Sequence, residues 1–246
     1  MSANKPICII PARGGSKRLP KKNIARIGGK PVIAWTIEQA HSAGIFEKII
    51  VSTDDKAISD VAADYPFVEI WNRPEELASD FATVDHVCLD ILSQLNNKTG
   101  FLPESFCCLY ATAILRSVDD ILLGYNKMQE GNCETAMTVT EYEQYPHQAL
   151  RYDGGKVNVQ WPDLLSTPRQ QRPHLVVDAG SVYWLKTKAF IQNENFYSND
   201  IEGYIVPRRR AIDLDTEEDL ELLKYYFSIM NKTSDTKIKD NGVLND

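Results

Sequence analysis

The sequence predicts an α/β fold in which helices cover both faces of a mostly parallel β-sheet. Residues 7–10 form an apolar run short enough for a buried strand, and residues 47–54 repeat this pattern after a stretch with helical periodicity. A strand, a helix and a strand in this order imply a right-handed crossover, which makes the two strands parallel. Residues 106–110 are continuously apolar, as expected of a central strand that is covered on both faces.

The other elements follow from periodicity and from signals at their ends. Pro31 suits the first turn of the helix that follows the first strand. Two later helices begin with acidic capping boxes, formed by Ser117 with Asp120 and by Thr216 with Asp219. The expected strands are residues 7–10, 47–54, 67–71, 106–110, 135–140, 176–185 and 204–207, and the expected helices begin near residues 31, 58, 84, 117 and 216.

Length and composition fit one domain with an inserted arm. The chain has 246 residues, of which 43% are hydrophobic, and we expect residues 1–230 to form a single domain. Residues 141–177 change to short β-like pieces around the turn signal Asp153-Gly154-Gly155, so we expect an arm that serves as an interaction surface. Residues 231–246 are polar and lack a repeating apolar face, which predicts a disordered tail.

Composition also excludes several classes of protein. The formal charge of -7 argues against a nucleic-acid-binding protein. No apolar stretch is long enough to span a membrane, and residues 1–5 do not resemble a signal peptide, so we expect a cytoplasmic protein without a membrane partner. The five cysteines form no C-x-x-C motif, which favours reduced thiols over zinc ligands or disulfides.

A basic loop (residues 11–23) follows the first strand and predicts an anionic ligand. It contains two adjacent glycines, which let backbone amides approach a ligand closely, at the sheet edge where open α/β folds bind ligands. Its five basic residues favour a polyphosphate, and they are Arg13, Lys17, Arg18, Lys21 and Lys22. The loop matches neither the P-loop nor the dinucleotide-binding pattern. The alternative is a solvated basic loop without a ligand.

Two carboxylates near the carboxyl end predict a metal site. Asp213 and Asp215 lie on one face of an extended segment, with Leu214 on the other face. Opposite a phosphate-binding loop, such a pair suits a hard divalent cation that also binds phosphate oxygens, which favours Mg²⁺. The alternative is that one aspartate only caps the last helix, but the capping box there already supplies that function.

These motifs resemble those of the nonulosonic-acid cytidylyltransferase family, which contains N-acylneuraminate and pseudaminic acid cytidylyltransferases. The resemblance is specific in residues 12–17, 19–23 and 29–31, and it extends from about residue 6 to about residue 225. It implies a Rossmann-like, GT-A-like nucleotidyltransferase fold and a homodimer held by the arm. It also implies an enzyme that uses CTP and Mg²⁺ to convert a nonulosonic acid sugar into its CMP derivative, with release of pyrophosphate.

The resemblance also implies roles for single residues. The nucleotide-binding candidates are Ala12, Arg13, Gly14, Gly15, Ser16, Lys17, Lys22, Asn23, Arg73 and Asp80. The substrate-binding candidates are Tyr110, Thr112, Gln148, Arg169, Gln171 and Asp178, of which the three arm residues are expected to serve a neighbouring subunit. The catalytic candidates are Arg13, Lys22 and the two metal ligands, Asp213 and Asp215. For Asp80 the alternative is a cap for the helix that follows it.

Two segments resemble the pseudaminic acid branch of the family. Tyr110 stands where sialic acid enzymes have Gln, and residues 178–184 read D-A-G-S-V-Y-W where those enzymes have R-P-N-G. The alternatives are the same reaction on N-acylneuraminate, legionaminic acid or 3-deoxy-manno-octulosonate, and a CTP-binding module without turnover, which the pair of metal-binding aspartates disfavours. No residue is an obvious general base, and both Asp178 and a metal-bound hydroxyl are open candidates.

Overall fold

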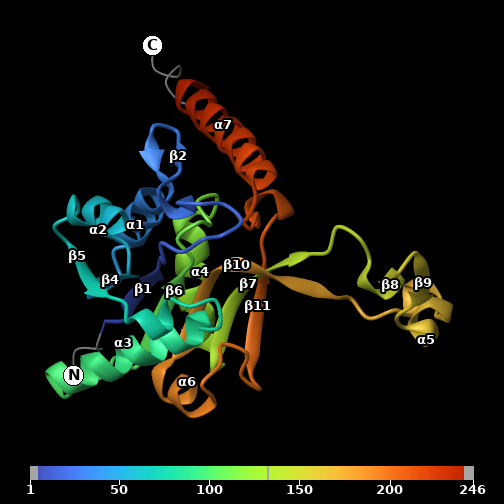
Figure 1. Cartoon of the computed structure of the whole chain (residues 1–246), viewed down its shortest axis with the longest axis horizontal. Helices are drawn as coiled ribbons and strands as arrows, with labels where there is room; N and C mark the ends of the chain where they lie inside the picture. Colours follow the sequence, from blue (N-terminus) through green and yellow to red (C-terminus); the bar gives the residue numbers. More distant parts are fainter. Residues whose placement is uncertain (1–4, 132, 241–246) are drawn as a thin grey trace.

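A seven-stranded sheet runs through the centre of the molecule (Figure 1). The computed structural model describes residues 5–131 and 133–240, with the backbone alone for residues 231–240 and for Arg169. In spatial order the strands are β11 (Ile201–Ile205), β7 (Thr135–Glu141), β10 (Val176–Lys186), β6 (Ser105–Leu109), β1 (Ile7–Pro11), β4 (Lys48–Thr53) and β5 (Val68–Asn72). Only β10 runs antiparallel to its neighbours in this sheet, so the predicted mostly parallel sheet is confirmed.

Helices cover both faces of this sheet, as predicted. One face is covered by α1 (Val32–Ser42), α2 (Lys56–Ala63) and α4 (Val118–Gly131), and the other by α3 (Val84–Thr99) and α6 (Thr187–Asn193). The smaller elements are the ribbon of β2 (Arg26–Ile27) and β3 (Lys30–Pro31), and the 3-10 turns η1 (Lys22–Ile24), η2 (Glu75–Leu77) and η5 (Arg208–Arg210). The described residues include no helix that is long and apolar enough to cross a membrane.

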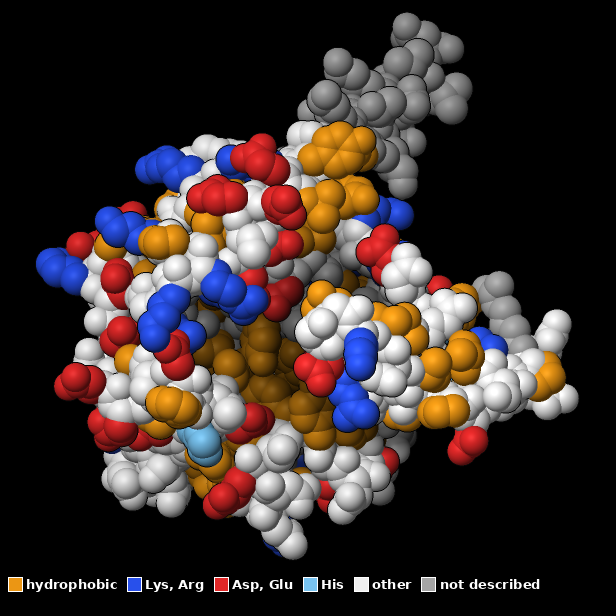
Figure 2. Space-filling model, turned by 45° about the vertical axis from the view of Figure 1, so that its right-hand side comes forward, with side chains coloured by type: hydrophobic (Ala, Val, Ile, Leu, Met, Phe, Trp, Pro, Cys, Tyr) orange, Lys and Arg blue, Asp and Glu red, His pale blue; other side chains and the backbone are white. Residues whose placement is uncertain are grey.

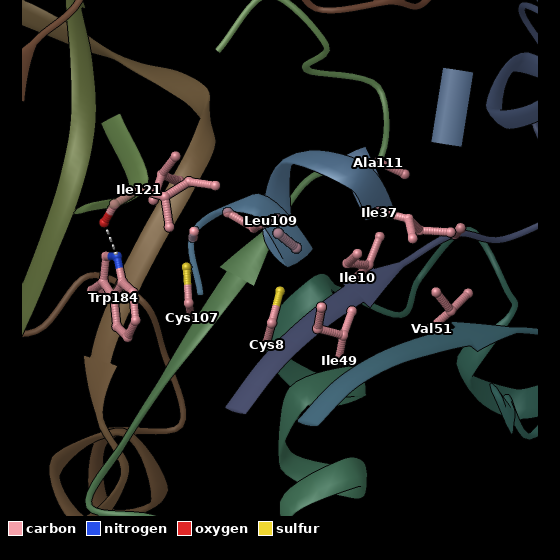
Figure 3. Packing of buried hydrophobic residues seen from close by; sticks show 14 of the residues in the cluster. Cys8, Ile10, Ile37, Ile49, Val51, Cys107, Leu109, Ala111, Ile121 and Trp184 are labelled. Atoms are coloured by element: carbon pink, nitrogen blue, oxygen red, sulfur yellow. Dashed lines mark hydrogen bonds between the residues drawn. The ribbon is translucent and has the colours of Figure 1, made fainter. Parts of the chain in front are cut away.

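The core divides into two layers because side chains alternate between the faces of each strand. Cys8 and Ile10 of β1 face α1, whereas Ile7 and Ile9 face α3. Figure 3 shows the first layer, in which strand residues from β1, β4 and β6 pack against Ile37 of α1. All five cysteines are buried and free, so the expectation of reduced thiols is confirmed.

The last helix, α7 (Glu217–Asp240), closes a third apolar cluster above the basic loop. Leu220, Leu223 and Phe227 on α7 pack against Leu19 of the basic loop and Val32 of α1. The helix continues to Asp240, although the sequence predicts disorder from residue 231; residues 241–246 lie outside the described part of the chain. Once packing has nucleated a helix, each added residue gains a backbone hydrogen bond, so the helix extends without an apolar face.

The arm projects from the sheet on a pair of extended connections (Figure 1). Its hairpin of β8 (Leu150–Asp153) and β9 (Lys156–Val159) turns at Gly154 and Gly155, which both have positive φ, as the turn signal predicts. The remaining arm elements are η3 (Pro146–Gln148), α5 (Pro162–Ser166) and η4 (Arg169–Gln171). No sequence signal predicted α5, which is only one turn long.

The topology brings several chain segments to one edge of the sheet. β1, β4, β5 and β6 are parallel, so the residues that follow them share that edge. β10 is antiparallel, and its beginning therefore lies beside the end of β6, where Tyr110 N donates to the Ser181 carbonyl at 3.2 Å. The candidate site lies at this edge.

Gly124 permits a close contact between α4 and the sheet. A Cβ at this position would lie 2.5 Å from Tyr204 Oη and 2.6 Å from Trp184 Cδ1. Neither ring can withdraw freely, because Tyr204 donates to the Asp120 carbonyl at 2.8 Å and Trp184 to the Ile121 carbonyl at 2.9 Å. The glycine thus lets two aromatic donors reach the backbone of α4.

We expect Gly124→Ala to destabilise the protein by about 1–3 kcal/mol, because the added methyl overpacks a site whose neighbours are fixed. Urea unfolding measures this change. The matched control is Asn126→Ala on the exposed side of the same helix, which should leave the free energy of unfolding unchanged or slightly higher. Equal stabilities of the two variants would contradict the packing argument.

Candidate active site

A cleft of about 350 Å³ opens at the carboxyl edge of the sheet. It gathers residues from both ends of the chain, from the segments after β5 and β6, and from the start of α3. Its lining includes eight of the residues selected from the sequence, which are Arg13, Lys22, Asn23, Arg73, Tyr110, Thr112, Asp213 and Asp215. Figure 2 shows the molecule hollowed between its body and the arm, with hydrophobic side chains on the floor and charged side chains around the rim.

The basic loop is held in place by the ends of β1 and β4. Ala12 N donates to the Ser52 carbonyl at 2.9 Å, and Gly14 N donates to Asp54 Oδ1 at 3.0 Å. A Cβ on Gly14 would lie 2.6 Å from an oxygen of Asp55, so this glycine is needed for packing against the neighbouring loop. Gly15 has open space around its Cα, which leaves it accessible to a ligand.

Asn23 fixes the loop from inside. It is buried, and its side-chain amide donates to the Arg13 carbonyl at 2.9 Å. The sequence predicts that Asn23 contacts the nucleotide. In the structure its side-chain amide nitrogen donates a hydrogen bond to the backbone of the loop. Its observed contact therefore shapes the strand end that presents Arg13.

The cations of the basic loop are paired with two aspartates. Lys22 Nζ lies 2.9 Å from Asp215 Oδ1, and Arg18 contacts the other oxygen of the same carboxylate. Arg13 lies 3.1 Å and Lys17 2.5 Å from the carboxylate of Asp80. Four of the five basic residues of the loop thus form ion pairs, and the two carboxylates offset part of the mutual repulsion of the loop's positive charges.

Asp213 lies beside Asp215 on the cleft side of the segment before α7. One side of Asp213 is open to solvent, but the cleft walls desolvate the carboxylate, and this desolvation together with the nearby Asp215 charge raises its pKa. Lys22 and Arg18 act in the opposite direction. Asp219 accepts hydrogen bonds from the backbone N–H groups of Asp215 and Thr216, so the predicted capping box is present and neither cleft aspartate is needed as a cap.

Arg73 supplies a buried cation at the back of the cleft. Its side chain donates to the Ser52 carbonyl at 3.1 Å, and its Nε has no hydrogen-bond partner among the described residues. Burial lowers its pKa, and the nearby Asp54 charge opposes that shift. A buried N–H without a partner is costly, so Arg73 is suited to receive an acceptor from a ligand.

Tyr110 and Thr112 form a wall of the cleft after β6. The Tyr110 ring packs on Tyr183 of β10, with 5.0 Å between the ring centres. Asp178 stands behind this wall and accepts hydrogen bonds from Tyr183 Oη at 2.8 Å, Tyr197 Oη at 2.6 Å and Gly180 N at 2.8 Å. The sequence predicts that Asp178 contacts the sugar. In the structure its carboxylate accepts from these three donors and supports the wall through Tyr183.

Other sequence-selected residues lie away from the cleft in this chain. Gln148 and Gln171 are exposed on the arm, and the side chain of Arg169 lies outside the described residues. Asp80 faces the basic loop, and the cap of α3 is Thr83, so the alternative role for Asp80 is wrong. The remaining nucleotide-binding candidates, Ala12, Gly14, Gly15, Ser16 and Lys17, belong to the basic loop but are not among the residues that line the cleft.

Two polar residues that line the cleft are absent from the predicted site residues. The sequence places Arg18 among the five basic residues expected to bind a polyphosphate, but only the fold shows that it reaches Asp215. Thr83 lines the cleft at the start of α3, where its side chain accepts from His86 N. A capping signal at Thr83 was readable from the sequence, but its place beside the basic loop depends on the sheet.

The carboxylate pair fits a magnesium ion. Among the described residues, no three His, Cys, Asp or Glu side chains are grouped to hold a metal by themselves. Mg²⁺ commonly takes one or two protein carboxylates and completes its shell with water and substrate phosphates, so two aspartates opposite a basic loop are a suitable donor set.

Comparison with known proteins identifies the family. A family model described as cytidylyltransferase matches residues 7–229. The chain belongs to the cytidylyltransferase family. This cytidylyltransferase is 34% identical over 236 residues to the pseudaminic acid cytidylyltransferase of Campylobacter jejuni, with 94% of this chain and 99% of the relative covered. It is 32% identical over 220 residues to the CMP-N,N'-diacetyllegionaminic acid synthase of Legionella pneumophila, with 88% and 93% covered.

Solved structures share the fold of this cytidylyltransferase. A CMP:2-keto-3-deoxy-manno-octonic acid synthetase in complex with CTP superposes with a TM-score of 0.66 at 16% identity, covering 92% of this chain and 99% of that one. A 4-diphosphocytidyl-2C-methyl-D-erythritol synthase gives a TM-score of 0.67 at 14% identity, with 91% and 98% covered. The predicted nucleotidyltransferase fold is thereby confirmed.

We expect Asp80→Asn to strengthen the binding of inorganic triphosphate by roughly twofold to fivefold at low salt, because Asp80 competes with the ligand for Arg13 and Lys17. The gain should shrink at high salt, since exposed charges are screened. Isothermal titration calorimetry measures both effects.

The matched control is Glu76→Gln, which changes the net charge equally in the same segment but removes no ion pair seen in the structure. If Asp80→Asn weakened triphosphate binding, Asp80 would contact the ligand directly, as the family resemblance implies.

Proposed function

We propose that this cytidylyltransferase joins CMP from CTP to pseudaminic acid. The observation that carries the proposal is the shared cleft, in which the basic loop faces Asp213 and Asp215. The sugar assignment is supported by the 34% identity to a pseudaminic acid cytidylyltransferase and by Tyr110 and the segment 178–184.

In this reaction the anomeric hydroxyl of the sugar acid attacks the α-phosphorus of CTP. A new oxygen–phosphorus bond forms, the bond from the α-phosphorus to the bridging oxygen breaks, the hydroxyl proton is lost and pyrophosphate leaves. Such transfer depends on alignment and on neutralisation of phosphate charge. Arg13, Lys17 and Lys22 would bind the triphosphate after releasing their aspartate partners, and Arg73 Nε would donate to the nucleotide.

Asp213 and Asp215 would hold Mg²⁺. When bound, the ion supplies positive charge to the phosphate oxygens. The raised pKa of Asp213 means that a proton competes with the ion at this carboxylate more than at an ordinary aspartate, so metal binding weakens as the pH falls. Tyr110 and Thr112 would form the wall against which the sugar acid is positioned.

The same reaction on legionaminic acid is a second candidate, supported by the 32% identity to a CMP-N,N'-diacetyllegionaminic acid synthase. Pyrophosphate release with CTP, Mg²⁺ and a panel of pseudaminic, legionaminic, N-acylneuraminic and 3-deoxy-manno-octulosonic acids separates the candidates. The highest kcat/KM is expected with pseudaminic acid. Preference for another acid would overturn the sugar assignment, and CTP binding without turnover of any acid would indicate a binding module.

We expect Asp215→Ala to reduce kcat by at least about 1,000-fold, because the proposed metal site loses a ligand and the phosphate charge is then less well neutralised. The midpoint of thermal unfolding should change little, since Asp215 lies at the cleft surface. Glu218→Ala, an exposed acid on the first turn of α7, is the matched control and should keep full turnover. Near-normal activity of Asp215→Ala would reject the metal site.

We also propose that residues 1–230 form one catalytic domain and that the arm, residues 141–177, joins two copies into a homodimer. The hairpin supports this proposal because one of its faces is apolar: Tyr152 is paired with Val157 and Leu150 with Val159. All four side chains are exposed, Tyr152 by 74%. A contiguous exposed apolar surface of this kind favours a partner.

We expect Val157→Glu to shift the protein toward the monomer in light scattering, because it places a charge in the proposed contact. Asn158→Glu adds the same charge on the opposite face of the hairpin, where Asn158 pairs with Arg151, and should leave the dimer intact. If both variants and the parent had one mass, the hairpin face would not be the contact.

A further inference from the structure

A buried arginine joins the segments that form the sugar side of the cleft. Arg116 follows the loop after β6 and is only 3% exposed. Its guanidinium donates to the Ser181 carbonyl at 2.9 Å and to the Tyr110 carbonyl at 3.1 Å. These carbonyls belong to two separate segments, one after β6 and one in β10, so a single planar group spans both.

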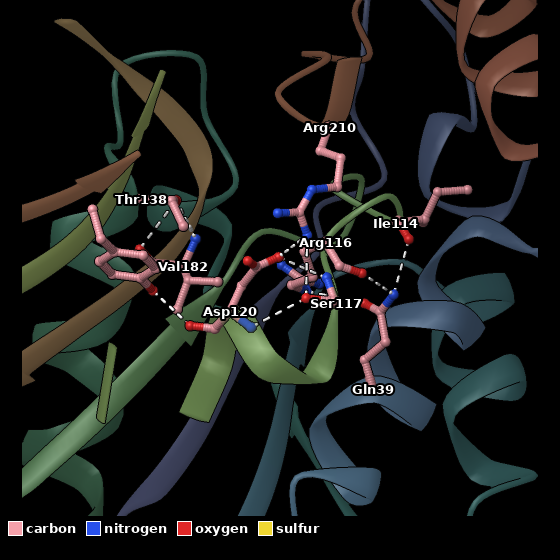
Figure 4. Close-up of polar contacts among 9 residues, drawn as sticks. Gln39, Ile114, Arg116, Ser117, Asp120, Thr138, Val182 and Arg210 are labelled. Atoms are coloured by element: carbon pink, nitrogen blue, oxygen red, sulfur yellow. Dashed lines mark hydrogen bonds and ion pairs between the residues drawn. The ribbon is translucent and has the colours of Figure 1, made fainter. Parts of the chain in front are cut away.

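The same guanidinium is anchored on α1. It donates to Thr36 Oγ1 at 2.6 Å and to Gln39 Oε1 at 3.0 Å. Thr36 in turn donates to the Ala111 carbonyl at 2.9 Å. Figure 4 shows Gln39 with the Ile114 carbonyl, to which its amide donates at 2.9 Å. The backbone after β6 is therefore held by hydrogen bonds to the carbonyls of Tyr110, Ala111 and Ile114.

The hydrogen bonds of Arg116 go to neutral acceptors. Asp120 is the nearby carboxylate that favours the charged form of Arg116, but it already accepts from Arg210 at 2.6 Å and from Ser117 N at 2.7 Å. Burial lowers the pKa of Arg116 to about 10, so the side chain stays charged at neutral pH. A buried cation without a carboxylate in contact is costly, and natural sequences keep such features where function requires them.

The two joined segments carry the wall of the cleft. Tyr110, Ala111 and Thr112 line the cleft directly. In β10 the pairing shifts register between Asp178 and Tyr183, and Gly180 there has a φ of +60°. This irregular turn places Ser181 against Tyr110. In contrast, the described contacts of Arg13, Lys22 and Arg73 do not involve Arg116, so the phosphate side is held independently.

We propose that Arg116 is a positioning residue that holds the Tyr110–Thr112 wall against the β10 turn and thereby sets affinity for the sugar acid. This inference rests on the proposed function. A lysine at this position would keep the charge but could not present the planar fork that reaches both carbonyls.

We expect Arg116→Lys to raise the KM for the sugar acid about tenfold while the KM for CTP stays within about twofold. Thr36→Val, which removes one anchor of the guanidinium and should disturb folding less, is expected to change the same KM in the same direction. Steady-state kinetics by pyrophosphate release measures both constants.

The matched control is Arg210→Lys. Arg210 belongs to the same network through Asp120 and Ser117, but it forms no hydrogen bond with Tyr110 or Ser181 among the described residues (Figure 4). It should change stability without separating the two KM values. Equal changes in both KM values for Arg116→Lys, or the same separation for Arg210→Lys, would overturn the proposal.

Hydrogen exchange keeps the test independent of the reaction. In Arg116→Lys the amides of residues 110–112 and 181–182 should exchange faster than in Arg210→Lys, whether or not a sugar acid is turned over. If exchange in Arg116→Lys rose only at these residues while the parent enzyme accepted no acid in the panel, the proposed function would fail and the positioning role of Arg116 would stand. Unchanged exchange would overturn the positioning role.

Discussion

The architecture of the cleft depends on opposite charges that meet across it. The basic loop concentrates cations that would repel one another, and Asp215 and Asp80 each bind two of them. These pairs are exposed or half-buried, so each is weak, and a triphosphate with several charges can replace the carboxylates. The aspartates thus offset the repulsion within the basic loop when no ligand is bound, and the proposed binding of CTP would exchange one set of ion pairs for another.

The sheet makes this meeting possible. Parallel strands place the basic loop, Arg73 and Tyr110 at one edge, although they are far apart in the sequence. The antiparallel β10 adds its own beginning to the same edge, which brings the Asp178–Tyr183 contact behind Tyr110. The segment before α7 then crosses the edge from the other end of the chain. The cleft therefore has one wall that is supported by packed aromatic rings at Tyr110, and another that consists of exposed or half-buried ion pairs.

Two features of the single chain indicate a need for other molecules. Arg73 Nε is buried without a partner among the described residues, which suits a ligand. The hairpin displays Tyr152 and its apolar neighbours to solvent, which suits a second copy of the chain. The first feature lies in the cleft and the second on the arm, so the proposed ligand site and the proposed dimer contact are on different surfaces of one protein.

The parallel sheet, the basic loop and the aspartate pair were predictable from local periodicity and from residue types at fixed spacing. The sequence also located the capping boxes at Ser117 and Thr216. It did not predict the ion pair of Arg18 with Asp215 or the hydrogen bonds of Asn23 and Asp178, because these depend on tertiary contacts. The tertiary structure alone decided which donor meets which acceptor, since strand order sets those neighbours and side-chain chemistry does not.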